Sequence, residues 1–152
     1  MTTVYKLTKP DMTTYNGFRY EVGRRYEFPG TGKLCGPGYS HVYLHPLLAG
    51  LLNPIHADYD PARLWEAEGV IAAIDHGLKA GCSVLTLVRE LPLPVLTLAH
   101  RVGFAIRCAQ AVYREPSFAA WATGWLVGTD RTEAAAEAAW AAEAAWAAEA
   151  AA

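Results

Sequence analysis

Short stretches of alternating apolar and polar residues run through the first half of the chain, and such alternation predicts β-strands. The first is TVYKLTK at 3–9, and the second is FRYEVG, which places Phe18, Tyr20 and Val22 on one face. Two further strands are predicted at 62–73 and 81–91. The stretch at 62–73 has an alternative interpretation as a helix, because Asp60-Pro61 is a good helix start. The strand is favoured because apolar and polar residues alternate there.

Turn and loop residues separate these strands. Asn16-Gly17 is a strong turn dipeptide. The segment YEFPGTGKLCGPGYS carries six glycines and prolines and predicts a loop, which either covers a pocket or merely connects two elements. A short helix is expected to begin near Pro46, in HPLLAGLLNP.

The spacing of apolar residues changes to a helical period in the second half. One amphipathic helix is predicted in LTLAHRVGFAIRCAQAVY, and a second in the segment that follows, with Ser117 as its N-cap and Gly128 at its end. A third begins at Asp130, which lies three residues before Glu133 as in a capping box. It would run about 22 residues, or roughly 33 Å.

Together these elements predict an α+β fold. Residues 1–94 would form a small mixed or antiparallel sheet with a short helix. Residues 95–152 would form an all-helical part that ends in a long alanine-rich helix, with a low-complexity tail at 131–152. The residues expected in the core are Phe18, Tyr20, Val22, Leu64, Val84, Leu85, Leu87, Ile106 and Trp121.

The tail places Trp140 and Trp146 six residues apart, which turns them about 120° around a helix. Such a helix has no continuous apolar face. It is either a solvated helix with two aromatic anchors or a surface that meets a second copy or another protein through these tryptophans. The tail's glutamates have no basic residue among them, which disfavours a parallel pair of tails.

Charge and cysteine content narrow the function classes. Thirteen basic and fifteen acidic residues give a net charge of −2, so the chain lacks the basic excess of a nucleic-acid-binding protein. Apolar runs are interrupted by Arg, His or Pro, so no membrane span is expected. Three cysteines without a CxxC pair suit a reducing cytosol.

Candidate chemistry is sparse. His41 and His45 lie four residues apart, but a strand there would separate them by about 13 Å, so no metal site is predicted. Cys35 lacks a base fixed by any motif and is interpreted as a structural thiol. Glu66 and Glu68 share one face of a strand, which is most simply its solvent face. No cofactor is expected from these patterns.

Three segments, YNGFRYEVGRRYEF, LCGPGYSHVYLHPLLAGLL and LWEAEG, resemble a family of uncharacterised proteins found mainly in bacteriophages and prophages. The resemblance covers about the first half of the chain. It implies a phage-type accessory protein in the cytoplasm of a bacterial host, and it implies no particular activity.

The segment SHVYLHPLLAGLL is also similar to a strand–helix element of small ADP-ribosyltransferases of the rifampin-modifying type. That likeness implies a ligand site at His41, Tyr43 and Glu90, where Tyr43 would stack on nicotinamide and Glu90 would be the acidic residue. The family's first strand bears a Tyr-His-Gly-Thr signature, and this chain has VYKLTKPD there instead.

Two hypotheses follow. The first is a non-enzymatic accessory protein that binds a host protein or a small nucleotide-like ligand and self-associates through its helices. The alternative is an NAD-dependent ADP-ribosyltransferase-like enzyme, with NAD or another nucleotide as cofactor. They differ in one geometric requirement, because the enzyme needs Tyr43 and Glu90 to face one cleft.

Overall fold

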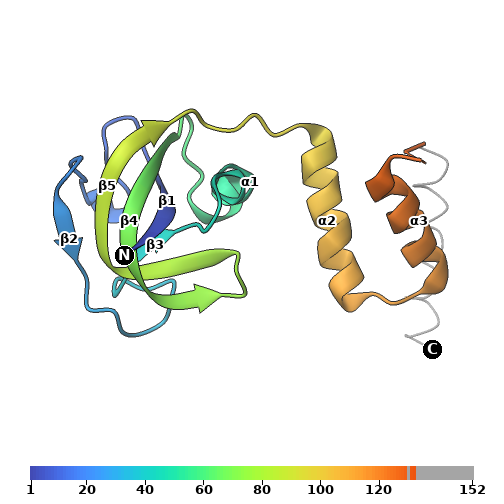
Figure 1. Cartoon of the computed structure of the whole chain (residues 1–152), viewed down its shortest axis with the longest axis horizontal. Coiled ribbons are helices and arrows are strands. Elements are labelled where there is room, and N and C mark those ends of the chain that lie inside the picture. The colour runs from blue at the N-terminus through green and yellow to red at the C-terminus, as the bar shows by residue number, and fades with distance from the viewer. Residues whose placement is uncertain (130, 133–152) are drawn as a thin grey trace. The chain divides into compact units, whose positions relative to one another are not determined.

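A computed structural model describes residues 1–129, 131 and 132, and it divides the chain into two compact units. The first unit spans Met1–Leu96 and the second begins at Thr97, close to the boundary that the sequence predicts at residue 94 (Figure 1). Each unit is described by itself below.

The first unit is built on a five-stranded antiparallel sheet with one helix. Its strands pair in the order β1-β4-β5-β2, and β3 pairs with β5. A short 3₁₀ turn, Tyr15–Gly17, lies between β1 and β2. In chain order the elements are β1 (Thr2–Thr8), β2 (Arg25–Glu27), β3 (Ser40–Val42), α1 (Pro46–His56), β4 (Arg63–Asp75) and β5 (Lys79–Leu91).

Four of these strands close into a ring. β1 pairs with β4, β4 with β5, and β5 with β3. Tyr43, directly after β3, then exchanges two backbone hydrogen bonds of 2.8 and 2.9 Å with Tyr5 of β1. Three register irregularities along β4, between Glu66 and Ala73, accompany the bending of the β4–β5 hairpin that closure requires (Figure 1).

The core lies inside this ring and consists of Val4, Tyr20, Val42, Trp65, Ala67, Ala80, Cys82, Leu85 and Leu87. Gly81 of β5 allows a close approach of the loop before β3. A Cβ atom there would come within 2.7 Å of both the Leu34 and the Tyr39 side chains. On the outer side of the ring, α1 packs against β1 and buries Ala49 and Leu52.

The second unit contains two helices in its described part. α2 (Leu98–Val112) starts at a capping box in which Thr97 and His100 satisfy each other's backbone N–H groups. α3 (Pro116–Val127) ends at Gly128, whose φ of 84° lies in the left-handed region. Ile106 and Ala122 are buried. No helix within the described residues has the length and apolar content needed to cross a bilayer.

The structure corrects the predicted fold class. The protein is α+β, with a five-stranded antiparallel sheet and three α-helices in its described residues. The part after residue 94 is not all helical, because 92–97 and 113–115 are irregular. Pro92 and Pro94 cannot donate the backbone hydrogen bonds of a helix, and Pro116 disfavours helical geometry at Glu115. The predicted tail helix with Trp140 and Trp146 lies outside the described residues.

The strands predicted at 3–9, 62–73 and 81–91 and the helix near Pro46 are confirmed. The predicted strand at 18–23 is wrong, because this segment makes only isolated bridges to Thr13 and Leu87. The N-cap of α3 is Glu115, not Ser117. The predicted core is correct for Tyr20, Leu64, Leu85, Leu87 and Ile106, whereas Val84 and Trp121 are half-buried and Phe18 and Val22 are exposed.

Candidate functional site

An exposed aromatic side chain, Phe18, stands at the centre of a cluster of rings. Its ring centroid lies 4.9 Å from that of Tyr20, 5.5 Å from that of Tyr26 and 5.6 Å from that of Phe28. Tyr20 is buried and Tyr26 and Phe28 are half-buried, whereas 40% of the Phe18 surface remains exposed. We call Phe18, these three rings and the charged side chains around them the Phe18 surface. The cluster therefore presents to solvent an apolar side chain that packs on three other rings.

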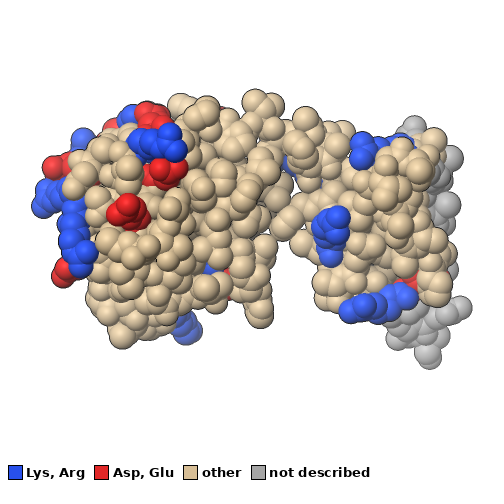
Figure 2. All heavy atoms as spheres, viewed as in Figure 1, with Lys and Arg blue, Asp and Glu red and all other residues tan. Residues whose placement is uncertain are grey.

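Charged residues of both signs surround the rings. Arg24 lies over the ring of Tyr26 at 5.3 Å and forms a 2.7 Å ion pair with Glu21. The other pairs are Arg25–Glu27 at 3.0 Å and Arg19–Asp11 at 4.0 Å. Figure 2 shows basic and acidic side chains interspersed on the side of the first unit that carries β2. The rim of the Phe18 surface is thus charged but balanced.

Two carboxylates that help to shape this region are stabilised in their ionised form. Hydrogen bonds from Thr13 are the main reason that the pKa of Asp11 lies below its ordinary value. A hydrogen bond from Arg63 does the same for the pKa of Glu90. Burial raises the pKa of Tyr20 to about 12, so its hydroxyl stays neutral and shares a 2.7 Å hydrogen bond with Ser40.

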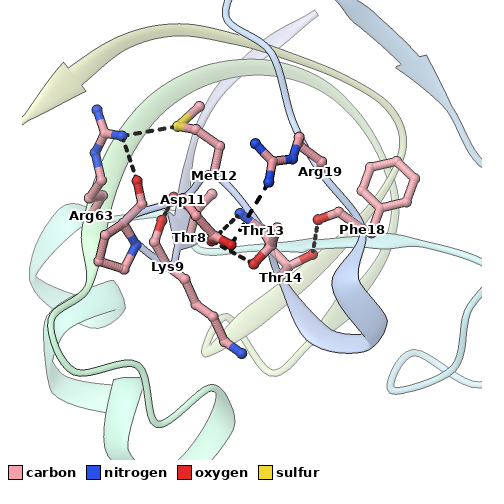
Figure 3. Close-up of polar contacts among 10 residues, drawn as sticks. Thr8, Lys9, Asp11, Met12, Thr13, Thr14, Phe18, Arg19 and Arg63 are labelled. Atoms are coloured by element: carbon pink, nitrogen blue, oxygen red, sulfur yellow. Dashed lines mark hydrogen bonds and ion pairs between the residues drawn. The ribbon is translucent and has the colours of Figure 1, made fainter.

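The segment that leads to Phe18 is held by a local network (Figure 3). The Asp11 carboxylate accepts hydrogen bonds from the backbone N–H and the hydroxyl of Thr13, at 3.0 and 2.7 Å. The backbone N–H of Thr14 donates to the carbonyl of Phe18 at 2.8 Å, and that of Tyr20 donates to Met12 at 3.0 Å. These bonds fix the position from which the Phe18 side chain projects.

Arg63 of β4 anchors the same segment to the sheet. Its guanidinium donates to the Pro10 carbonyl at 3.0 Å and contacts the Met12 sulfur at 3.3 Å (Figure 3). It also makes two hydrogen bonds to Glu90, at 2.6 and 2.8 Å, and lies over the ring of Trp65. Glu90, a predicted ligand residue, therefore orients the arginine that supports the Phe18 surface.

A second cluster contains the predicted residues His41 and Tyr43. Because Val42 and Ala80 point into the core, their strand neighbours His41, Tyr43 and Lys79 point to the outer side of the ring. The Tyr43 ring stacks on the ring of His56, with centroids 6.0 Å apart and planes 11° apart. The predicted His41 and Tyr43 thus share one face, together with Lys79 and His56.

Burial dominates the ionisation of this second cluster. It lowers the pKa of His41 and of His56, and the nearby Lys79 lowers both further. It raises the pKa of Tyr43 to about 12. His41 Nε2 contacts the Leu34 carbonyl, so the ring proton lies on Nε2 in the neutral form. Both imidazoles are therefore expected to be neutral at pH 7.

Tyr43 and Glu90 do not face one cleft. Tyr43 has only 5% of its surface exposed and packs on the outer side, against α1. Glu90 is the cross-strand partner of Trp65, whose ring lies in the core, so Glu90 projects from the opposite face of the sheet. The sheet therefore separates the two residues that the enzyme hypothesis brings together.

Residues 2–99 match the family described as "Domain of unknown function (DUF7666)", and this match spans the first unit from its second residue onward. The chain belongs to the DUF7666 family. No curated protein and no solved structure matches it. Membership of DUF7666 therefore supplies no substrate, ligand or partner, and the two clusters must be interpreted from their geometry.

The DUF7666 domain also carries the glycine-rich loop expected from the sequence. The Gly30 N–H donates to the Gly38 carbonyl at 2.8 Å and closes the loop. An open hollow of about 350 Å³ is lined by Pro29, Thr31, Gly32, Lys33, Gly36, Pro37 and Gly38. His45 caps α1 by accepting a hydrogen bond from the Leu47 N–H. Among residues 1–129, 131 and 132, no three His, Cys, Asp or Glu side chains gather closely enough to hold a metal ion.

Sequence reasoning missed the exposure of Phe18 and the burial of Lys79 in this DUF7666 domain. The apolar–polar alternation from Phe18 to Val22 is typical of a strand with one buried face. In the structure this segment makes only isolated bridges, and Phe18 and Val22 are exposed. Lys79 follows a tight turn in which His76 and Gly77 have positive φ, and it alternates with the core residue Ala80. The sequence signal for this position is a lysine at the start of an apolar strand that begins KAGC.

Proposed function

We propose that the protein is a non-enzymatic accessory protein that binds a partner protein through the Phe18 surface. The observation that carries this proposal is the exposed Phe18 ring at the centre of three supporting rings. Aromatic side chains and arginines are enriched at the centres of protein interfaces. A partner that buries Phe18 would remove a large apolar side chain from water without disturbing the core beneath it.

The balance of charge around Phe18 supports a protein partner in preference to nucleic acid. Arg19, Arg24 and Arg25 each lie beside a carboxylate, at 4.0 Å or less. Phosphate binding requires arginines and lysines that can neutralise phosphates, and paired arginines would have to lose their partners first. A protein with an apolar side chain at its centre and charges of both signs around it matches the Phe18 surface.

The biological context and cellular location that we propose for this function are inferred from the sequence. The resemblance to phage and prophage proteins supports a role in infection, with a host protein as the partner. The three cysteines are free thiols, which agrees with a reducing compartment such as the cytoplasm of the host. Self-association through the tail remains part of the proposal and would use Trp140 and Trp146.

The NAD-dependent alternative has no geometric support. It needs Tyr43 and Glu90 beside one bound nicotinamide, and these residues lie on opposite faces of the sheet. The Tyr43 ring is already stacked on His56. Glu90 is already paired with Arg63.

Site-specific photo-crosslinking in the native cell tests the proposal. A benzophenone amino acid is placed at Phe18 in one variant and at Leu47 in a control. Leu47 is a good control because it is 45% exposed and lies on α1, on the opposite side of the first unit from β2 (Figure 1).

The proposal predicts one dominant crosslinked protein from position 18 and none in common from position 47. The identified protein, purified separately, should then bind the full chain. Equal, diffuse crosslinking at both positions would contradict the proposal. A crosslink from position 18 to a second copy of the chain would replace the partner protein with a homodimer.

A further inference from the structure

Lys79 is a buried lysine whose ammonium group meets a thiol. Only 8% of its surface is exposed, and its Nζ donates a 3.0 Å hydrogen bond to Cys35 Sγ. Within the described residues, that sulfur is the one hydrogen-bond acceptor of this ammonium. Asp75 is its cross-strand neighbour in the hairpin, yet the two form no ion pair of 4.0 Å or less in the described part of the chain.

The neighbouring ionisable groups do not offer a competing negative charge at close range. His41 and His56 both have a pKa lowered by burial and by Lys79 itself. The His41 Nε2 proton is already directed to the Leu34 carbonyl. The Cys35 sulfur is therefore the atom to which the Lys79 amine is directed.

The two side chains differ in access to solvent. Cys35 is exposed on the glycine-rich loop, so a small oxidant can reach its sulfur. Lys79 approaches the same sulfur from the buried side, at the start of β5. A buried amine within hydrogen-bond distance of an exposed thiol is placed to intercept the first oxidation product of that thiol.

We propose that Cys35 and Lys79 form an oxidation-dependent sulfur–nitrogen cross-link, a sulfenamide, when the protein meets a peroxide. This modification site is independent of the Phe18 surface. It would join the loop at 29–38 covalently to β5 and restrict the loop's movement.

The chemistry has two balanced steps. First, the Cys35 thiol is oxidised by hydrogen peroxide to sulfenic acid, and the peroxide is reduced to water. Second, the Lys79 nitrogen attacks the sulfur, the S–N bond forms and the S–O bond breaks. The hydroxyl leaves with one proton from nitrogen as a second water molecule, and a protonated amine releases its additional proton to solvent. The linked chain has lost two hydrogen atoms, and a thiol reductant restores both side chains.

The other cysteines provide internal controls. Cys82 is fully buried, and burial raises the pKa of its thiol to about 11, so it should resist peroxide. Cys108 is exposed like Cys35. It has no lysine near it in sequence, because Lys79 is the last lysine of the chain. Cys108 should therefore be oxidised without forming a link to nitrogen.

Mass spectrometry of the full chain tests the proposal. The wild-type chain, in which Cys108 is the control, is compared with the Cys108→Ser variant, in which a disulfide between the two exposed thiols cannot produce the same loss of hydrogen. After peroxide treatment, the expected product is a peptide pair joined at Cys35 and Lys79, lighter by two hydrogens and separated by dithiothreitol. This peptide map needs no further variant.

A second variant distinguishes a link from simple proximity. In Lys79→Arg, Cys35 should accumulate as sulfenic acid, so its labelling by dimedone should rise several-fold over the chain that retains Lys79. The proposal fails if dimedone labels Cys35 equally with and without Lys79 and no linked peptide appears. A linked peptide that retains one additional oxygen and is still separated by dithiothreitol would also overturn it, because a sulfinamide resists thiols and the oxygen would then lie between sulfur and nitrogen.

Discussion

At the scale of single residues, Lys6 shows that the alternation of apolar and polar residues along a strand does not determine which charged side chains are buried. The pattern of β1 indicates a strand, but it does not show that Lys6 lies inside the ring with only 6% of its surface exposed. There its Nζ donates to the His41 carbonyl at 2.7 Å and lies 5.2 Å from the centre of the Tyr20 ring. A charged residue in a strand is normally expected on the solvent face, so only the closed sheet reveals this one.

Burial of Lys6 should make stability depend on pH. Desolvation lowers its pKa from 10.5 to about 8. The unfolded chain therefore binds more protons than the folded chain above about pH 8, and stability should rise with pH in that range. Between about pH 7 and pH 9 the gain should be on the order of 1 kcal/mol.

Urea unfolding at these two pH values checks this prediction, with Lys6→Met as the variant that removes the titrating group. The rise should disappear in Lys6→Met. The raised pKa of Cys82, about 11, acts in the opposite direction above its ordinary value of 9.0 and makes the observed rise smaller. An equal rise in both proteins would show that another group is responsible.

At the scale of elements, the strands with clear alternation were predictable and the segment carrying Phe18 was not. β1, β4 and β5 each place several apolar residues on one face, and their long antiparallel pairs follow. The segment at 18–23 has the same alternation, but its conformation depends on contacts between residues that lie far apart in the sequence. Arg63 lies more than fifty residues from Pro10 and Met12, and no local pattern predicts that contact.

Removing the Arg63 contacts should loosen the segment before Phe18. In Arg63→Gln, amide hydrogen exchange at Thr14 and Tyr20 should become several-fold faster, because the guanidinium no longer holds Pro10 and Met12. Arg89→Gln is the matched control. Arg89 also makes two hydrogen bonds to a carboxylate, that of Glu66, but among the described residues it makes no side-chain hydrogen bond or ion pair to this segment. Unchanged amide exchange in Arg63→Gln would show that the Arg63 contacts do not hold this segment in place.

Two glycines should respond to alanine in opposite ways. Gly81→Ala should destabilise the first unit by about 1–3 kcal/mol, because its new methyl group would overlap Leu34 and Tyr39. Gly103→Ala should stabilise α2 by roughly 0.5–1 kcal/mol, because its methyl group would meet Trp125 at an ordinary 3.5 Å. Thermal unfolding of both variants measures the difference. Destabilisation by both would mean that packing around Gly103 is tighter than this geometry indicates.

At the scale of the whole molecule, the change to helical spacing near residue 94 predicts two parts, but this spacing does not determine the nature of the second part. Helical spacing after Leu96 predicted α2 and α3, and Gly128 was correctly placed at the end of α3. The predicted all-helical part is wrong because prolines interrupt the helical pattern at 92–97 and 113–115. The predicted site residues are also divided in the structure, because His41 and Tyr43 share one face of the sheet whereas Glu90 lies on the other.

The first unit should fold without the second. Its core residues all lie within Met1–Leu96, and the family match ends at residue 99. A chain ending at Leu96 should therefore keep the amide chemical shifts of β1, β4 and β5 seen in the full protein. Nuclear magnetic resonance spectra of the two chains make the comparison. Loss of dispersed signals in the shorter chain would show that the second unit is needed for the fold.

The affinity of the purified partner for Phe18→Ala tests the central claim most directly. Isothermal titration calorimetry should compare the full wild-type chain with Phe18→Ala and with the control Leu47→Ala, after circular dichroism has shown that all three are folded. The Phe18 surface predicts a loss of roughly tenfold or more in affinity for Phe18→Ala, as expected for a central aromatic contact, and almost none for Leu47→Ala. Equal affinity of all three proteins would contradict the claim that Phe18 is the centre of the binding site.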